Sequence, residues 1–455
     1  MADFVVKEGL DIPISGKPTG GLQTLPAPKK VSLNLFPFFG VKFKLLAKVG
    51  DRVKVGQAIT DDKSNPGRFF VSPGCGVIRE VKRGLKRRLL DIVIELDGKE
   101  EYEALPTLDP RSASRDDILA ALMKGGMMTH IRQRPFDRLA DPSRFPRSIF
   151  VKAITSAPFA PPAEMHVEGS EKAFQAGLTA LSKLCDGGKL HLVYREGSTC
   201  QAFTNAQDCT KHTVAGPHPA GNASVHIHHF DPIKGADDSV WTLTAQDVVA
   251  IGHQFQTGHY YTDRVISIAG PGIQDKKRGF FKVRAGFPIE TLIAGRNERG
   301  LQRMISGDPL TGLKVEANDY LGFYHNVFCV IPEQVSRELF HFFRLGTHKF
   351  TASGTYASGF MDNTAREYDF TTSNHGEERA FVDGAIYQSV MPMQVPVMHL
   401  VKALMAENFE DAEFLGGLEV SAEDFALPAF VDPCKIEMVE IVKNGLRAYE
   451  HEVFA

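Results

Sequence analysis

Five histidines lie within 18 residues near the middle of the chain, and imidazole nitrogens are common metal ligands. The group consists of His212, His218, His226, His228 and His229. His226 and His228 are two residues apart, so on a strand they would share a face, and His218 could approach from the preceding loop. Three convergent imidazoles can bind a divalent metal ion. No carboxylate stands at ligand spacing within the group, which favours the alternative that these histidines are only hydrogen-bonded.

Aromatic rings beside arginines form a second candidate group. Residues 35–40 (LFPFFG) are too aromatic for a solvent loop, and their proline prevents an ordinary central strand. This segment either fills a crevice between domains or faces a hydrophobic ligand or membrane-bound partner, and residues 134–136 (RPF) offer the same choice. An aromatic wall beside an arginine could hold a quinone ring and bind its carbonyl oxygens. The candidate quinone-binding residues are Phe36, Phe38, Phe39, Arg132, Arg134 and Phe136. For Arg132, Arg134 and Arg138 the alternative is structural ion pairing or contact with a partner.

Gly125 and Gly126 stand where a nucleotide- or flavin-binding domain would carry a loop that cradles phosphate. Such a loop needs several glycines, so that backbone N–H groups can approach the phosphate, and a helix N-terminus behind them. Here only two glycines are present, and Met127 and Met128 follow them. Because methionine side chains would push a pyrophosphate away, we expect no nucleotide at this loop.

Motifs for nucleophilic or metal-dependent catalysis are absent from the sequence. The chain has no G-x-S-x-G, no G-x-x-x-x-G-K-[ST] and no H-E-x-x-H. Its six cysteines are scattered without C-x-x-C spacing, which argues against a four-cysteine iron–sulfur or zinc site and indicates reduced thiols. We therefore expect no catalytic side chain, no resident cofactor and no metal ion in this chain.

Composition and charge narrow the class of protein further. The 455 residues suffice for roughly three or four domains. A net charge of -3 argues against nucleic-acid binding, which needs a concentrated basic surface. Residues 82–88 (KRGLKRR) form a dense basic cluster, either a solvated hairpin loop or a patch that meets a partner or anionic headgroups. No apolar run of 18 residues exists, and the N-terminus lacks the regions of a secretory signal.

The elements that must position these groups begin with two glycine-punctuated hairpins. In residues 49–59 and 72–81, valines alternate with polar residues, which predicts short strands joined by tight turns. Gly50, Gly56, Gly74 and Gly76 can adopt positive φ at the turns; all four lie in these two segments. The pattern resembles the barrel-sandwich hairpins of lipoyl- and biotinyl-type domains, which present a modified lysine on a turn. Lys63 stands near that position, although Pro66-Gly67 close behind it favours an unmodified lysine.

The sequence predicts an α/β multidomain protein with five segments. They are an extended Pro/Gly-rich arm (1–30), a barrel-sandwich β-domain (31–100), a Rossmann-like α/β domain without a flavin loop (101–256), a β-grasp (SLBB-like) domain (257–330) and a helical C-terminal domain (331–455). In the second segment we predict a strand over 89–96. In the third, helices over 114–123, 171–184 and 244–254 alternate with strands over 149–154 and 190–194, which suggests a parallel or mixed sheet.

Strands and helices are also predicted for the last two segments, 257–330 and 331–455. Residues 264–272 and 280–283 predict strands, and a helix begins near Pro288. From Pro332 onward apolar residues recur at helical spacing, which predicts helices packed on a core. The three stripes are Val335, Leu339, Phe342 and Phe343; Val397, Leu400, Val401 and Leu404; and Val439, Val442, Leu446 and Tyr449.

Taken together, several short stretches resemble one family along nearly the whole chain. They are residues 7–16 (KEGLDIPISG), the hairpin 49–59, 131–136 (IRQRPF), 216–221 (GPHPAG), 226–228 (HIH), 390–392 (VMP), 415–419 (LGGLE) and 423–427 (EDFAL). The chain is similar to the A subunits of sodium-translocating NADH:quinone oxidoreductases. More distantly it resembles the flavin-binding subunits of complex I and of the related ferredoxin-linked complex, whose glycine-rich flavin loop and cysteine set this chain lacks.

This resemblance implies a peripheral subunit on the cytoplasmic face of the bacterial inner membrane, in a complex that reduces ubiquinone with NADH and exports Na⁺. The flavins and iron–sulfur cluster of such a complex would lie on other subunits, among the membrane subunits B, D and E and subunits C and F. The resemblance thus favours a structural role with a contribution to a quinone site. The alternatives are an electron-entry subunit that binds FMN and NADH, and a lipoylated or biotinylated carrier.

Overall fold

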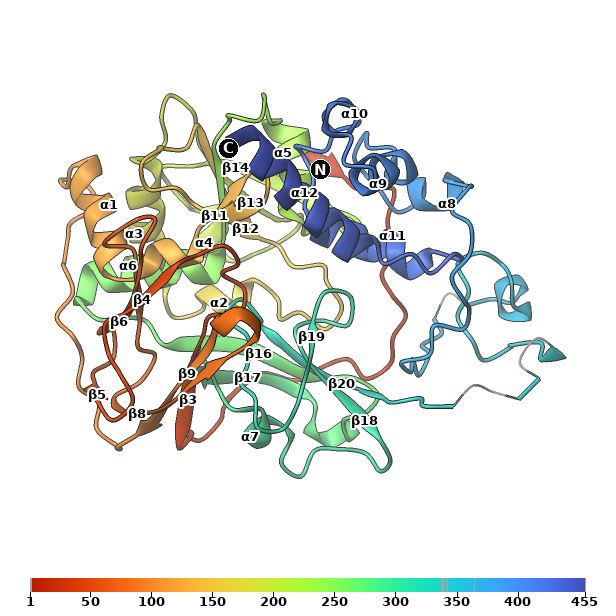
Figure 1. Cartoon of the computed structure of the whole chain (residues 1–455), viewed down its shortest axis with the longest axis horizontal. Helices are drawn as coiled ribbons and strands as arrows, with labels where there is room; N and C mark the ends of the chain where they lie inside the picture. The colour runs from red at the N-terminus through yellow and green to blue at the C-terminus, as the bar shows by residue number, and fades with distance from the viewer. Residues whose placement is uncertain (1, 337–338, 341–342, 364, 455) are drawn as a thin grey trace.

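The computed structural model describes residues 2–336, 339–340, 343–363 and 365–454. Four β-sheets and a group of C-terminal helices make up these residues (Figure 1). The two N-terminal β-sheets and the six-stranded sheet that contains β16–β20 lie in the lower half of Figure 1. The seven-stranded α/β sheet and the C-terminal helices lie above them.

The N-terminal β unit consists of a four-stranded and a three-stranded sheet that share one core. The larger sheet has the order β3 (Lys30–Asn34), β9 (Leu89–Leu96), β8 (Gly76–Arg83) and β5 (Arg52–Val53). The smaller has the order β4 (Phe43–Leu45), β6 (Ala58–Asp62) and β7 (Phe69–Val71). Ile59, Ile78 and Ile92 from the two sheets are buried in the shared core. The predicted strand over 89–96 is confirmed.

The glycines of the two hairpins act in two different ways. Gly50 and Gly56 have φ values of 96° and 80°, as the turn prediction requires. Gly74 and Gly76 do not adopt positive φ, so the prediction is wrong for them. A Cβ atom at Gly76 would overlap the carbonyl oxygen of Glu95 on β9, and one at Gly74 would overlap Leu96. These two glycines therefore allow close approach between β8 and β9 rather than a turn.

The α/β unit is built on a seven-stranded sheet whose four central strands are parallel. Its order is β1 (Phe4–Val5), β14 (Thr210–Ala215), β13 (Leu190–Arg195), β12 (Ser148–Ala153), β15 (Val240–Thr244), β10 (Arg132–Arg134) and β11 (Arg138–Leu139). The helices of this unit are α1 (Arg115–Lys124), α2 (Glu164–Val167), α3 (Glu171–Ser182), α4 (Gln201–Thr204), α5 (Ala223–Phe230) and α6 (Ala245–Thr257). Central β12 has β13 on one side and β15 on the other, as in doubly wound sheets.

Capping and alternation explain these elements. Ser114 caps α1 by accepting a hydrogen bond from the backbone N–H of Asp117, and Thr244 forms a capping box with Asp247 at α6. On β12, Ile149 belongs to the core shared with α3 and α6, whereas Phe150 belongs to the core shared with α5 and the C-terminal helices. The predicted helices and strands of this segment are confirmed within a few residues at their ends.

The third unit is a six-stranded mixed sheet with one short helix. Its order is β19 (Leu313–Val315), β18 (Gln302–Ser306), β20 (Val327–Pro332), β16 (Asp263–Ala269), β17 (Gly279–Arg284) and β2 (Leu22–Thr24), and α7 (Ile289–Ile293) begins after Pro288. Parallel β16 and β20 beside antiparallel β17 and β18 give the arrangement expected of a β-grasp module. The N-terminal arm contributes edge strands to two sheets, since β1 pairs with β14 and β2 with β17.

The C-terminal segment agrees with the prediction only in part. Over the described residues between 333 and 384 no helix longer than one turn forms, and Val335, Leu339 and Phe343 of the first stripe are exposed; the predicted helix is wrong there. Phe342 lies outside the described residues. Val335 and Leu339 are 80% and 73% exposed, so burial does not stabilise a helix at these two residues. Gly346, Gly354 and neighbouring serines also disfavour a helix.

Helices begin at residue 385 and pack against the α/β unit. They are α8 (Ala385–Gln388), α9 (Val397–Met405), α10 (Phe409–Phe414), α11 (Ala426–Val431) and α12 (Met438–Phe454), with the 3₁₀ turn η6 (Ala422–Phe425) before α11. The stripe on α9 is confirmed as core, because Val397, Leu400, Val401 and Leu404 are buried in one cluster with Phe150. On α12, Val442, Leu446 and Tyr449 belong to the same cluster, whereas Val439 is only partly buried. Among the described residues, no helix combines the length and the apolar character needed to cross a membrane.

Candidate functional site

The aromatic loop after β3 divides its rings between the core and the surface. Phe38 is buried, with its ring centroid 4.8 Å from that of Phe70 and 5.0 Å from that of Phe323 in the third unit. Phe36 and Phe39 are 39% and 56% exposed. One ring thus fills the junction between domains, as the first alternative predicts. Two rings are exposed, and whether they face a ligand or a partner stays a prediction.

Two guanidinium groups from distant parts of the chain lie on the exposed Phe39 ring. Arg88, directly after the 3₁₀ turn η1 (Leu85–Arg87), lies 4.8 Å from the Phe39 centroid and 5.3 Å from that of Phe36. Arg447 on α12 lies 3.8 Å from the Phe39 centroid. Arg88 also donates a hydrogen bond to the carbonyl oxygen of Phe36. Cation–π contacts therefore hold Phe39 between the N-terminal β unit and the C-terminal helix.

The charge of this site is only partly compensated: Asp137 pairs with Arg132, and the charges of Glu440 and Glu450 act on Arg447. Within the described part of the chain, neither Arg88 nor Arg447 forms a salt bridge. Burial lowers the pKa of Arg88 below its usual value, and burial together with the nearby charges of Arg88 and Arg132 lowers the pKa of Arg447. Three arginines thus meet around an exposed aromatic surface, and such a surface favours a ligand or partner that accepts hydrogen bonds or carries negative charge.

Arg132 on β10 lies at the inner end of this cluster. Its Nη2 atom is 3.0 Å from Oδ2 of Asp137, and its guanidinium is 5.6 Å from the ring centroid of Tyr324. Burial alone would raise the pKa of Asp137, but Arg132 and Arg134 hold that pKa at about 2. Asp137 is therefore ionised at neutral pH and fixes Arg132 in place.

Arg134, Phe136 and Arg138 make structural contacts. The Arg134 side chain is 3% exposed, donates from Nη1 to Oγ of Ser224 at 2.8 Å, and has Nη2 3.5 Å from Oε1 of Glu423. The Phe136 ring is buried edge-on against Tyr449 at 5.3 Å. Arg138 pairs with Glu450 on α12 at 3.0 Å. The ion pairs and the hydrogen bond of Arg134 and Arg138 support the structural alternative for these two residues. The side chains of Phe38, Arg134 and Phe136 are enclosed by protein, and direct quinone contact by these three stays a prediction.

Sequence reasoning missed two members of the accessible cluster. Arg88 belongs to the basic run 82–88, but nothing in the sequence shows that its side chain turns back onto the aromatic loop. Arg447 stands on the polar side of the last helical stripe and carries no local signal at all. The accessible cluster therefore consists of Phe36, Phe39, Arg88, Arg132 and Arg447.

The glycines of the supposed phosphate loop face protein. A Cβ atom at Gly125 would overlap the side chain of Gln254, and one at Gly126, where φ is 74°, would crowd Val71. Met127 and Met128 are fully buried. The close backbone approach that these glycines permit is therefore used by α6 and β7.

The five histidines do not converge. His226 and His228 lie on helix α5, so the expectation of a shared strand face is wrong. His226 is fully buried with Nε2 2.8 Å from the carbonyl oxygen of Ala220, and burial lowers its pKa to about 3. The other four have separate partners: Ser156 for His218, Glu419 for His228, His191 for His212 and the Phe4 ring for His229. The hydrogen-bonded alternative is confirmed for His212, His218, His226 and His228, whereas His229 stacks on the Phe4 ring. No described group of three or more His, Cys, Asp or Glu side chains is arranged to hold a metal ion.

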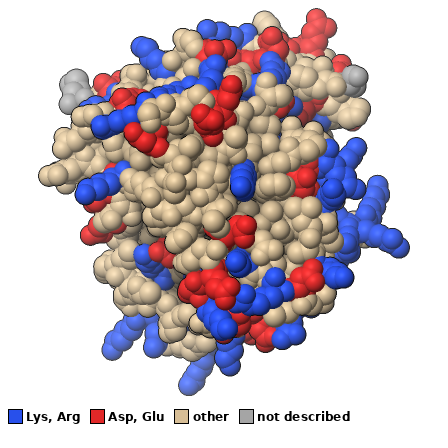
Figure 2. Space-filling model, turned by 90° about the vertical axis from the view of Figure 1, so that its left-hand side faces the viewer, with Lys and Arg blue, Asp and Glu red and all other residues tan. Residues whose placement is uncertain are grey.

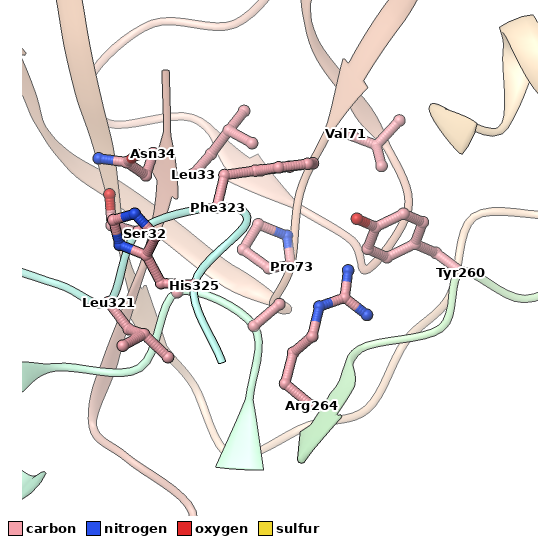
Figure 3. A pocket seen from close by; sticks show the side chains of 13 residues that line it. Ser32, Leu33, Asn34, Val71, Pro73, Tyr260, Arg264, Leu321, Phe323 and His325 are labelled. Atoms are coloured by element: carbon pink, nitrogen blue, oxygen red, sulfur yellow. The ribbon is translucent and has the colours of Figure 1, made fainter. Parts of the chain in front are cut away.

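Two cavities lie away from the aromatic cluster. One of about 20 Å³, room for about one water molecule, lies where three units meet. Figure 3 shows Tyr260 and Arg264 on one side of it and Ser32 and His325 on the other. A groove of about 720 Å³ lies between the arm, residues 156–162 and residues 350–363 and 365–368. Lys17 pairs there with Glu367 at 2.8 Å. None of the six predicted quinone-binding residues borders either of these two cavities.

Lys63 and the cysteines complete the residues singled out from the sequence. Lys63 is exposed on the turn that joins β6 and β7, as the barrel-sandwich pattern predicts. All six cysteines are free thiols, and Cys75 and Cys329 are buried.

Comparison with known proteins assigns three parts of the chain to family models. Residues 4–97 match the model described as NqrA N-terminal barrel-sandwich hybrid domain, residues 113–260 the NqrA second alpha/beta domain, and residues 265–317 the NQRA C-terminal domain. The barrel-sandwich and α/β assignments agree with the two units described above.

Curated relatives match the chain over nearly its full length. The A subunit of the Na(+)-translocating NADH-quinone reductase of Pseudomonas aeruginosa (strain UCBPP-PA14) is 37% identical, covering 98% of this chain and 99% of that protein. The proteins of the same name from Chlamydia pneumoniae and Photorhabdus laumondii are 37% and 36% identical over 99% and 98% of this chain, and over 98% and 99% of their own lengths. Among solved structures, an air-oxidized NAD+-reducing [NiFe]-hydrogenase has a TM-score of 0.39 and 13% identity, covering 75% of this chain and 62% of that chain, a likeness that carries no argument.

Proposed function

Because this chain belongs to the NqrA family, the A subunits of Na(+)-translocating NADH-quinone reductases, we propose that it is a peripheral, cytoplasm-facing member of such a complex and that its aromatic–arginine surface forms one wall of a ubiquinone site. The complex would reduce ubiquinone with NADH and export Na⁺. In this proposal the chain docks on the membrane subunits B, D and E and on subunits C and F, and is not itself catalytic.

The observation that carries the quinone proposal is the half-exposed Phe39 ring between Arg88 and Arg447. A quinone has flat apolar faces and two carbonyl oxygens that accept hydrogen bonds. Phe36 and Phe39 offer aromatic surface, and the guanidinium N–H groups are donors that also favour negative charge on a reduced ring. Since Phe36 and Phe39 are partly exposed, the opposite wall would come from a membrane partner.

The buried residues of the predicted quinone set support this wall from behind. Phe38 anchors the aromatic loop on Phe70 and Phe323, and Arg134 ties β10 to α5 and η6. Phe136 packs on Tyr449 of α12, close to Arg447 on the same helix. These contacts fix the positions of Phe39, Arg132 and Arg447 without touching a ligand.

Replacing Phe39 with alanine in the assembled complex should raise the apparent KM for ubiquinone by about tenfold, as expected for loss of one aromatic contact. The rate with a soluble electron acceptor that bypasses the quinone site should not change. Both rates are measured on the purified complex, and Phe414→Ala, which removes an 88% exposed phenylalanine on α10, is the matched control.

An unchanged KM in intact Phe39→Ala complex would refute the quinone part of the proposal. If the variant instead loses membrane subunits on a native gel while the KM of the remaining complex is normal, the surface serves docking alone.

We further propose that the redox cofactors of the complex, its flavins and iron–sulfur cluster, lie on other subunits. The filled space beside Gly125 and Gly126 and the scattered cysteines support this. The purified natural polypeptide should show no absorbance band above about 320 nm, roughly the range where flavins and iron–sulfur clusters absorb, that corresponds to one cofactor per chain. Its intact mass should equal that of the sequence, with Lys63 unmodified. A stoichiometric yellow or brown chromophore, or added lipoyl or biotinyl mass, would contradict this.

A further inference from the structure

The turn η1 between β8 and β9 carries the most exposed large apolar side chain of the described residues. Leu85, at its apex, is 93% exposed, and Arg83, Lys86 and Arg87 around it are exposed as well. In Figure 1 the turn lies on the side that faces the viewer, below α12. The turn therefore combines one exposed aliphatic side chain with three exposed cationic ones.

The backbone holds this arrangement in place. Lys86 and Arg87 have φ values of 53° and 60°, a left-handed conformation that residues with side chains seldom adopt without support from their surroundings. The support comes from hydrogen bonds that close the turn: the N–H of Gly84 donates to the Arg88 carbonyl at 2.9 Å, and Nη1 of Arg83 donates to the Arg87 carbonyl at 3.1 Å. Leu85 is thus presented outward rather than folded back onto the β unit.

The positive charge of the turn has no counter-charge. In the part of the chain that the structure describes, Arg83, Lys86 and Arg87 form no salt bridge, whereas Lys82 at its base lies 3.5 Å from Asp319. The whole chain nevertheless carries a net charge of -3. Figure 2 shows basic side chains gathered at its right-hand edge, the side that faces the viewer in Figure 1, and mixed charges over the rest of that face.

We propose that this turn binds the surface of a membrane that contains anionic phospholipids, with Leu85 entering the headgroup region and Arg83, Lys86 and Arg87 binding lipid phosphates. A single aliphatic side chain at an apex, flanked by long cationic side chains, matches the boundary between acyl chains and phosphates. An acidic protein surface would satisfy the cations but would leave the protruding Leu85 without a pocket. This contact is separate from the proposed quinone site, because the turn residues take no part in it.

Binding of the purified full chain to vesicles tests the proposal. The chain should co-sediment with vesicles of phosphatidylglycerol and phosphatidylcholine, and much less with phosphatidylcholine alone, and added salt should weaken the binding. Lys86→Ala/Arg87→Ala should lower the affinity by about 25-fold, at roughly fivefold for each cation removed near the surface. Leu85→Ser should weaken binding without removing its dependence on salt.

The matched control is Lys276→Ala/Lys277→Ala, which removes the same charge from another three-residue 3₁₀ turn, η3 (Asp275–Lys277). Equal vesicle binding by the two double variants would overturn the proposal. Absence of vesicle binding by the unaltered chain would also overturn it. If, in that case, the Lys86→Ala/Arg87→Ala variant dissociates from the complex, the turn binds an acidic protein surface instead. Because the quinone proposal is judged by KM in the complex, either proposal can fail without the other.

Discussion

Replacement of Arg134 by alanine should destabilise the chain by about 3–5 kcal/mol, the range for breaking a buried ion pair from one side. Arg134 is 3% exposed and joins three segments, through Ser224 on α5, Glu423 on η6 and Asp137 beyond β10. Its loss removes a buried guanidinium and leaves Asp137 and Glu423, whose side chains are 36% exposed, with less compensating charge. Thermal unfolding of the full chain, followed by circular dichroism, should show a fall in the midpoint of roughly 10 °C.

The loss of unfolding free energy in Arg134→Ala should depend on pH because of two carboxyl groups, Asp137 and Asp424. Asp137 has a pKa of about 2, held low against burial by Arg132 and Arg134, so its ionised form stabilises the fold above its ordinary pKa and that contribution is lost as the pH falls toward 2. Burial and Glu423 raise the pKa of Asp424, and Arg134 opposes this. Without Arg134, ionised Asp137 and Asp424 are both less favourable at neutral pH. The deficit should therefore be largest near neutral pH and shrink in acid, where both groups become protonated.

The control for Arg134 is Arg79→Ala, which removes an exposed ion pair with Glu95. Exposed pairs contribute little, so the midpoint of this variant should move by no more than about 2 °C. If Arg134→Ala unfolds like Arg79→Ala and instead alters only the KM for ubiquinone, Arg134 contacts the ligand and its structural assignment is wrong.

Much of the fold could be predicted because its signals are local. The strand β9 follows from alternation, α1 from the cap at Ser114 and its acidic first turn, and the barrel-sandwich hairpins from paired glycines. The helix predicted after Pro332 does not form in the described residues, for a physical reason. A short amphipathic segment is stable as a helix only where its apolar face is buried, and Val335 and Leu339 are exposed.

The candidate site was less predictable, because it depends on which side chains face outward. In the loop after β3, sequence alone cannot show that Phe38 turns inward onto Phe323 while Phe36 and Phe39 stay exposed. Arg447 reaches Phe39 only because α12 crosses the α/β unit near the N-terminal β unit, a contact between the two ends of the chain. The predicted shared face of the histidines was wrong for a similar reason, since His226 and His228 lie on α5 and bind different partners.

Replacement of Gly252 by alanine should destabilise the α/β unit by about 2–3 kcal/mol, although helix propensity alone predicts the opposite sign. Gly252 lies in α6, where alanine would by itself stabilise the helix by about 1 kcal/mol. A Cβ atom there would overlap the carbonyl oxygen of Ala173 on α3, and one at Gly177 of α3 would overlap the Val248 carbonyl on α6. The two helices therefore approach through a pair of glycines, and added methyl groups must force them apart.

Thermal unfolding can separate the effect of helix propensity from that of the steric overlap between α3 and α6. The thermal midpoint of Gly252→Ala should fall by roughly 5–10 °C, with faster hydrogen exchange in α3 and α6. Gly21→Ala is the control, because no atom lies within 4 Å of a Cβ built at Gly21 and its φ is not positive; it should leave the midpoint unchanged or slightly raised. A rise for Gly252→Ala would mean that α3 and α6 are not in glycine-mediated contact. Since α6 fills the space beside Gly125 through Gln254, such a rise would also reopen the question of what occupies the supposed phosphate loop.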